Sequence, residues 1–478
     1  MLAFGDTQGF VFSGYLQKPF ASYLLLKVAD RAKARAFLRD LCQLVTTGKD
    51  RPNDACVNVA ISAAGLSALG LPEEAFQTFP LEFREGMAGS ETRSRALGDT
   101  GSSDPSHWRW GRPNDRVHVL LMLFARDEAL LERLVAAQRS AFTGALSVSY
   151  ERRTRALPEQ REHFGFTDGI TQPIIEGSGQ ERRSGSVVKA GEFILGYRNE
   201  YGKLPFVPNV APELDVAGHL EDCEPDHRRR ALGHNGSYLV VRELDQRVYD
   251  FWRYQREAAE RLNPGSTAAD GAVRLAAKCV GRWPSGAPLV NAPDADDRRL
   301  AQDDDFGYFW RDRDGQRCPI GAHIRRTNPR DSLEPDPIDS KRAVARHRLL
   351  RRGRSYGPAI DAPWRVASDD GVERGLFFIC LNSNIRRQFE FVQQTWVNNP
   401  KFGGLYQERD PLIGDNDGAA SDFTIPGEPT RQRLEGLPRF VDVRGGEYFF
   451  LPSVRALRFL ASLPVSDPEL SDENGGTR

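Results

Sequence analysis

Apolar and polar residues alternate along the first third of the chain with two different periods. Short apolar or period-two runs predict strands, and apolar positions three to four residues apart predict helices. The pattern predicts strands over residues 21–29, 55–62, 116–125 and 145–153 and helices over residues 30–48 and 127–144. The later helix places Leu131, Leu134, Val135, Gln138 and Phe142 on one stripe. Two successive strand–helix–strand units are typical of a ferredoxin-like α+β sandwich.

The second half of the chain resumes this alternation after a loop-rich middle over about residues 152–235. Strands are predicted over residues 235–244, 375–382 and 447–453, and helices over residues 248–262, 385–399 and 454–463. The pattern therefore indicates a second β–α assembly with long loops. The last residues, 466–478, have the composition of a disordered tail.

Composition narrows the class of protein. Hydrophobic residues make up 40% of the 478 residues, and the formal net charge is −1, which argues against a surface devoted to nucleic acid. The six cysteines form no CxxC motif, so zinc ribbons and covalent c-type haem have no support. We find no secretion signal, and the longest apolar run, residues 119–125, is too short to span a membrane. These observations predict a cytoplasmic protein that binds neither membranes nor nucleic acid.

Two short motifs carry candidate chemistry. His323 lies in CPIGAHIRRTNPRD, where it is a buried structural histidine, part of an arginine-rich anion site, or a ligand. Asp168 lies in GFTDGITQP between Gly165 and Gly169, which allow a close backbone approach to a bulky ligand. An ordinary Asp-Gly turn is the structural alternative for Asp168.

Two further segments add to the candidate site. Seven of the fourteen residues in 341–354 are basic and none is acidic, which is typical of a solvated helix face or a nucleic-acid patch. Arg351 stands there beside apolar residues and requires an anionic partner. The strand GLFFICLN projects Leu376 and Phe378 to one side, as any core strand would.

Together these parts are those of a haem peroxidase pocket. A neutral imidazole is the common protein ligand of haem iron, and Arg330 or Arg325 could pair with the propionates. A carboxylate can move a proton between the oxygens of peroxide, and an arginine can stabilise the charge that develops as the O–O bond breaks.

The sequence resembles the dye-decolorising peroxidases over most of its length. The resemblance rests on GDTQGFVFSGY, GFTDGITQP, VVKAGEFILGYRNEYGKLP, NGSYLVVREL, CVGRWPSGAPLV, CPIGAHIRRTNPRD, LLRRGRSYG, GLFFICLN and EYFFLPS. GFTDGITQP matches the Gly-x-x-Asp-Gly signature of that family. The chain is identified as a member of the longer bacterial, cytoplasmic type.

The resemblance implies a fold and a set of roles. The fold is α+β, with two ferredoxin-like halves over residues 1–205 and 206–465, antiparallel sheets and peripheral helices, and the haem is carried by the second half. His323 is then the proximal iron ligand, with Asp168, Arg351, Leu376 and Phe378 as the catalytic residues of the distal side. The residues that touch the porphyrin are Gly169, Ile170, Thr171, Asn328, Pro329, Arg330 and Arg351.

The implied activity is that of a haem b peroxidase. It reduces hydrogen peroxide and oxidises bulky donors, such as dyes and phenols, by one-electron steps. A donor too large for the pocket would be oxidised at a surface Trp or Tyr, with Trp252 and Trp396 as examples. Asp410 and Asp415 are both candidates for the carboxylate that orients His323. A haem-handling protein without turnover, or a nucleic-acid binder that uses residues 341–354, are the alternatives.

Overall fold

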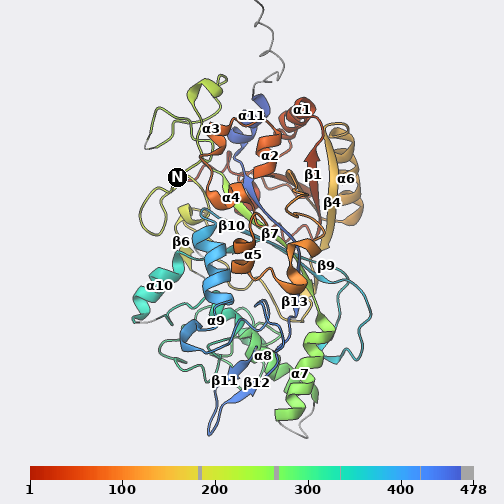
Figure 1. Cartoon of the computed structure of the whole chain (residues 1–478), viewed down its shortest axis with the longest axis vertical. Coiled ribbons are helices and arrows are strands. Elements are labelled where there is room, and N and C mark those ends of the chain that lie inside the picture. The colour runs from red at the N-terminus through yellow and green to blue at the C-terminus, as the bar shows by residue number, and fades with distance from the viewer. Residues whose placement is uncertain (181–185, 225, 263–267, 334, 420, 464–478) are drawn as a thin grey trace, which may run out of the picture.

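The centre of the molecule is one nine-stranded sheet (Figure 1). The computed structural model describes residues 1–180, 186–224, 226–262, 268–333, 335–419 and 421–463. The strands of the sheet are β1 (Phe20–Val28), β2 (Ala55–Ser62), β3 (Val119–Ala125), β4 (Leu146–Arg155), β7 (Ser237–Gln246), β8 (Leu350–Arg351), β9 (Arg354–Tyr356), β10 (Gly375–Asn382) and β13 (Val441–Leu451). Every pair of neighbours in it is antiparallel.

The order of the strands repeats within the sheet. It runs β4-β1-β3-β2-β13-β7-β10-β8, with β9 beside β10. When β8 and β9, which pair with β10 in one register, are counted as one strand, each half places its strands in the order fourth, first, third, second. The two halves join where Phe449 and Phe450 of β13 pair with Ser62 and Ile61 of β2. The α+β class with antiparallel pairing is confirmed, and the two predicted sheets are continuous. The boundary between residues 205 and 206 stays a prediction.

Helices cover one face of the sheet in the first half. Four of them are α1 (Arg31–Leu41), α2 (Ala63–Ala68), α6 (Glu128–Ala141) and α11 (Val454–Ser462). Phe37 and Leu131 of these helices share a buried cluster with alternate strand residues such as Val59 and Leu121. The short helices of the first half are α3 (Glu73–Phe76), α4 (Leu81–Glu85) and α5 (Glu91–Leu97). The short strands β5 (Ile174–Ile175) and β6 (Val187–Val188) place Ile175 and Val188 in the buried cluster on the other face of the sheet.

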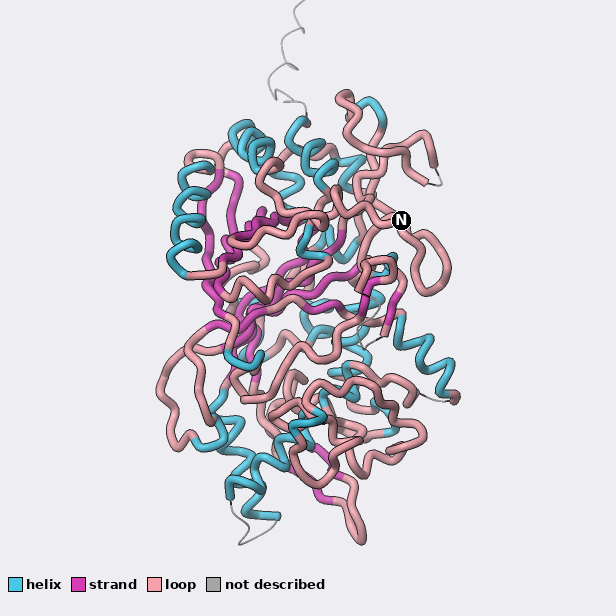
Figure 2. The backbone as a smooth tube through the Cα atoms, turned by 180° about the vertical axis from the view of Figure 1, so that it is seen from behind, coloured by secondary structure: helices cyan, strands magenta, loops and turns pink. Residues whose placement is uncertain are grey.

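A second body of helices and loops packs below the sheet, and loops make up much of it (Figure 2). It contains α7 (Val248–Leu262), α8 (Ala268–Val280), α9 (His323–Thr327), α10 (Pro337–Ala345), β11 (Phe423–Ile425) and β12 (Gln432–Leu434). This body has its own buried cluster, which includes Trp252, Leu275 and Phe423. Its junction with the sheet is where the predicted site residues meet.

Several predicted elements differ in the structure. The helix predicted to end at Gly48 ends at Leu41, because the backbone of Thr46 turns to hydrogen-bond with Val57 of β2. The helix predicted over residues 385–399 consists of π-helical turns at Arg386–Glu390 and Val392–Val397. Helices α8 and α10 were not predicted. The predicted tail, residues 466–478, lies outside the described residues.

Among the helices that the structure describes, none is both long and apolar enough to cross a membrane.

Gly353 lies in the short break between β8 and β9, where the chain passes close to the backbone of β10. A Cβ atom at this position would lie 2.8 Å from the carbonyl oxygen of Phe377 and 3.0 Å from Cα of Phe378. Because both are backbone atoms, Gly353→Ala should lower the free energy of unfolding by about 1–3 kcal/mol. Gly14→Ala, where the nearest atom is 3.4 Å away, is the control and should leave it nearly unchanged. Equal chemical-denaturation midpoints for the two variants would contradict this account.

Candidate active site

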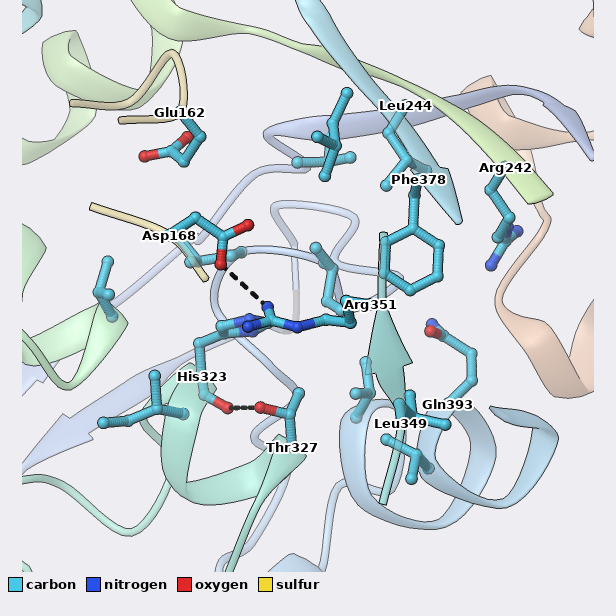
Figure 3. A pocket seen from close by; sticks show the side chains of 18 of the residues that line it. Glu162, Asp168, Arg242, Leu244, His323, Thr327, Leu349, Arg351, Phe378 and Gln393 are labelled. Atoms are coloured by element: carbon cyan, nitrogen blue, oxygen red, sulfur yellow. Dashed lines mark hydrogen bonds and ion pairs between the residues drawn. The ribbon is translucent and has the colours of Figure 1, made fainter. Parts of the chain in front are cut away.

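A cavity of about 270 Å³ lies between the sheet and the body that carries α9. It brings together residues from segments far apart in the sequence (Figure 3). The predicted site residues that line it are Asp168, Gly169, Ile170, Thr171, His323, Asn328, Arg330, Arg351, Leu376 and Phe378. Pro329 does not line it. The predicted residues therefore share one site, with that one exception.

His323 is the first residue of α9 and is oriented by a buried carboxylate. Its Nδ1 lies 2.9 Å from Oδ2 of Asp410, a fully buried side chain. Oδ1 of Asp410 accepts the backbone N–H groups of Leu412 and Ile413. Burial alone would raise the pKa of Asp410, but His323 and these amides hold that pKa below its ordinary value.

The same hydrogen bond fixes what His323 can do. A carboxylate partner makes Nδ1 the protonated ring nitrogen, which leaves the lone pair of Nε2 available to a metal ion in the cavity. Asp415, the other candidate from the sequence, pairs with Arg409 at 2.8 Å. The carboxylate that orients His323 is therefore Asp410.

The arginines that follow His323 hold α9 in place. Arg325 donates to the backbone oxygens of Asp312 and Cys318, both at 2.9 Å, and does not line the cavity. Arg326 is fully buried and donates to the backbone oxygens of Trp396 and Glu408. The hypothesis that Arg325 pairs with a cofactor carboxylate is therefore wrong, because its donors serve carbonyl groups of the fold.

Asp168 and Arg351 meet in the cavity. Nη1 of Arg351 lies 3.1 Å from Oδ1 of Asp168, which also accepts the backbone N–H of Gly169 at 2.6 Å. Gly165, with φ of +96°, lets this loop pack against Pro363 and Trp364, where a Cβ atom would lie 2.8 Å from Pro363. Asp168 is thus the anionic partner that Arg351 required.

The neighbouring arginine faces away from this pair. Arg352 donates to the backbone oxygens of Phe10 and Val11 in the N-terminal segment. Arg351 itself is held by the pairing of β8 with β10, opposite Cys380. Of the two adjacent arginines, Arg351 is the one that lines the cavity.

The sheet contributes an apolar wall. Leu376 and Phe378 alternate along β10 with Phe377 and Ile379, which are fully buried on the other face. Leu376 pairs with Leu244 of β7, which also lines the cavity. Apolar residues of this kind keep bulk water away from a reactive centre.

Three arginines that line the cavity, Arg282, Arg330 and Arg348, differ in their partners. Arg282 and Arg330 both contact Asp304. Arg348 is 8% exposed, and its guanidinium has no hydrogen-bond or ion-pair partner among the described residues. Burial lowers the pKa of Arg348 to about 10. A buried arginine without a partner that lines a cavity fits an anionic ligand.

These residues fit haem better than a protein-held metal ion. Among the described residues there is no group of three or more His, Cys, Asp or Glu side chains that could hold a metal ion. His323 therefore suits an iron that arrives with the ligands of its own macrocycle. The apolar wall matches a porphyrin ring, and Arg348 matches its carboxylates.

The sequence did not reveal every residue of the site. Arg348 was not distinguished from the other basic residues of 341–354. Its position three residues before Arg351 was the signal that could have identified it. Glu162 and Gln393 also line the cavity, Gln393 from the π-helical turns. Such turns are rare and occur often at functional sites. No signal in the sequence distinguished Gln393 from its neighbours.

The structure also changes which aromatic residues are candidates for oxidation at the surface. Trp252 is fully buried and Trp396 is 4% exposed, so neither can meet a bulky donor. Their proposal as surface residues is wrong, because both pack inside apolar clusters. Trp310, in contrast, is 82% exposed.

The chain is similar to curated peroxidases along most of its length. It is 32% identical to a dye-decolorizing peroxidase of Exidia glandulosa, over 84% of this chain and 74% of that protein. It is 30% identical to a multifunctional dye peroxidase of an Amycolatopsis species, over 91% of each chain. No family model matches the chain.

Solved structures give the same answer for the fold. A fungal DyP-type peroxidase from Auricularia auricula-judae superposes with a TM-score of 0.78 at 28% identity, over 97% of this chain and all of that one. A dye-decolorizing peroxidase in complex with 2,6-dimethoxyphenol also superposes with a TM-score of 0.78, at 27% identity and with the same coverage.

The buried hydrogen bonds of Asp410 should raise the free energy of unfolding of the protein without cofactor. Asp410→Asn loses charged hydrogen bonds and should lower the free energy of unfolding by about 2 kcal/mol at pH 7. Because the folded pKa is depressed, this stabilisation is present above about pH 4 and is lost as the pH falls through the folded pKa. The difference from wild type should therefore shrink on acidification in urea titrations. A difference that grows on acidification would contradict the assignment.

Proposed function

The chain belongs to the dye-decolorising peroxidase family, and we propose that it uses haem b, with His323 on the iron and Asp168 and Arg351 acting on peroxide. It is a peroxidase for bulky organic donors. The observation that carries the assignment of residues is the meeting of the Asp168–Arg351 pair and an oriented imidazole in one cavity. In the view of Figure 3, Asp168 lies above Arg351 and His323 rises from the helix below.

Haem, when bound, supplies an iron centre that takes oxidising equivalents from peroxide and passes them to donors one electron at a time. Nε2 of His323 would hold the iron. Arg348 is the best candidate for a propionate partner, because Arg330 is already engaged with Asp304. Gly169, Ile170, Thr171 and Asn328 would touch the ring, as would Leu376 and Phe378.

Asp168 moves the proton in the proposed mechanism. Its carboxylate takes a proton from peroxide and returns it to the oxygen that leaves as water. The guanidinium of Arg351 stabilises the negative charge that develops as the O–O bond breaks, and it holds the carboxylate of Asp168 toward the cavity. Leu376 and Phe378 exclude water from this step.

The substrates follow from this arrangement. Hydrogen peroxide fits the distal side, and dyes and phenols give up electrons one at a time. Donors too large for the cavity require a surface residue, for which Trp310 is exposed. The cytoplasmic location stays a prediction, supported by six cysteines that are all buried free thiols.

The rival interpretations lose their main support. Haem handling requires His323 but not the Asp168–Arg351 pair. Nucleic-acid binding requires that the basic run face solvent. Arg348 and Arg351 instead line the cavity, and the buried Arg354 donates to the backbone oxygens of Gly14 and Tyr15.

Removal of the imidazole tests the cofactor assignment. His323→Ala should weaken haem binding or alter the absorption of the bound haem, because the cavity loses the imidazole nitrogen that would hold the iron. The measurement is a haem titration of the purified protein, followed by its absorption spectrum. The control is His347→Ala, because His347 stacks on Phe391 and does not line the cavity. An unchanged spectrum in His323→Ala would contradict the assignment.

Removal of the distal groups tests the catalytic assignment. Asp168→Asn and Arg351→Leu should each slow the reaction with hydrogen peroxide by about 10²–10⁴-fold, while haem binding stays intact. Stopped-flow absorption of the haem-loaded variants measures this rate. If both variants react at the wild-type rate, the protein does not use these residues, and haem handling becomes the better explanation.

A further inference from the structure

A line of three aromatic rings leads from the cavity to the surface. Phe166 lines the cavity and stacks on Trp252 of α7, with ring centres 6.3 Å apart and ring planes within 3° of parallel. Trp252 in turn meets the ring of Trp364 edge-on, with centres 6.1 Å apart. Trp252 is fully buried, whereas Trp364 is partly exposed. The rings therefore connect the cavity wall with solvent through successive aromatic contacts.

Trp364 is held in place by two neighbouring segments. It lies in a 3-10 turn, Pro363–Arg365, of the loop between β9 and β10, and Figure 1 shows this loop beside α7. Arg256 of α7 donates to the backbone oxygen of Trp364 at 3.2 Å. On its other side the turn packs against Gly165, where a Cβ atom would lie 3.4 Å from the indole. The outer end of the line is thus fixed both to α7 and to the loop of Asp168.

Trp310 is more exposed than Trp364 but lacks such a connection. Among the described residues its ring contacts that of Phe309, and neither residue lines the cavity. Exposure alone therefore favours Trp310, whereas continuity with the cavity favours Trp364.

We propose that a donor too large for the cavity is oxidised at Trp364, and that Trp252 carries the electron from there toward the cavity. The proposal rests on the proposed function, in which peroxide supplies the oxidising equivalents. One electron passes from the donor to Trp364, then to Trp252, and past Phe166 into the cavity. Each peroxide takes up two electrons and two protons to give two molecules of water, so two donor molecules each lose one electron.

The proton on the indole of Trp252 stays in place during this transfer. Its Nε1–H donates to the backbone oxygen of Phe164 at 3.2 Å. A backbone carbonyl group accepts a hydrogen bond, but it is not basic enough to take the proton itself. Trp252 therefore gives up only an electron, which it regains from Trp364. No proton has to cross the apolar cluster around it.

Trp364→Phe and Trp252→Phe test the route, with Trp283→Phe as the matched control. Trp283 is 5% exposed in the same apolar cluster as Trp252, and its Nε1 also donates to a backbone oxygen, that of Ala292. It does not line the cavity. In the haem-loaded protein, both route variants should oxidise a sulfonated anthraquinone dye about tenfold or more slowly than wild type. The control should oxidise this dye at the wild-type rate.

The reaction with peroxide is measured in the same samples, because Trp364 also packs against the loop of Asp168. A dye rate that falls only in parallel with the peroxide rate would mean a structural role and would overturn the proposal. Loss of dye oxidation in Trp310→Phe but not in Trp364→Phe would place the donor at Trp310, with the same consequence. If wild type does not react with peroxide, the proposed function fails and the route falls with it. If wild type reacts and both route variants keep their dye rate, the route alone is refuted.

Oxidation of the indoles themselves supplies a readout that does not depend on turnover. Haem-loaded protein is mixed with one equivalent of peroxide without a donor, then digested and mapped by mass spectrometry. Trp364 should gain oxygen in wild type and in Trp283→Phe, but stay unmodified in Trp252→Phe, because the route is interrupted. Protein without haem, treated alike, measures direct oxidation by peroxide. Equal oxidation of Trp364 in Trp252→Phe and wild type would contradict the route. Phe166→Leu interrupts the same line at the cavity wall and replaces Trp252→Phe if that variant does not fold.

Discussion

The hydrogen bond between His323 and Asp410 is the contact on which the arrangement of the site depends. Asp410 is fully buried and is held by the amides of Leu412 and Ile413, so its carboxylate cannot turn toward solvent. A charged group in such a place needs a partner, and the imidazole supplies it. Because Nδ1 is thereby occupied, Nε2 remains for the cavity. The hydrogen bonds of Arg325 and Arg326 keep α9 where the contact between His323 and Asp410 can form.

The distal residues reach the cavity by a different route. The loop of Asp168 follows the first half of the sheet, yet it packs against the second body, where Phe166 stacks on Trp252 at 6.3 Å. Arg351 comes from the edge strand β8, and the ion pair joins the two segments. Both groups are only half-buried, so this contact contributes little to stability. Its value lies in the chemistry that the two side chains perform together.

The fold could be predicted from strong local signals, and the main site residues from their combination and from the motifs that resemble the dye-decolorising peroxidases. Period-two and helical patterns identified most strands and outer helices, and the glycines around Asp168 marked a close approach. Arg348 and Gln393 could not be predicted, since their importance arises from burial against a cavity formed by distant segments. The sequence also left Asp410 and Asp415 equivalent, because only the packing decides which carboxylate meets His323. The structural roles of Arg325 and Arg326 could not be predicted, because no local pattern shows which backbone carbonyl groups accept their hydrogen bonds.

A crystal structure of the haem-loaded protein tests the central claim most directly. The account predicts iron bound to Nε2 of His323, with Nδ1 still on Asp410, Asp168 and Arg351 on the opposite face of the ring, and the propionates at Arg348. Iron bound by another residue, or haem seated outside this cavity, would contradict it.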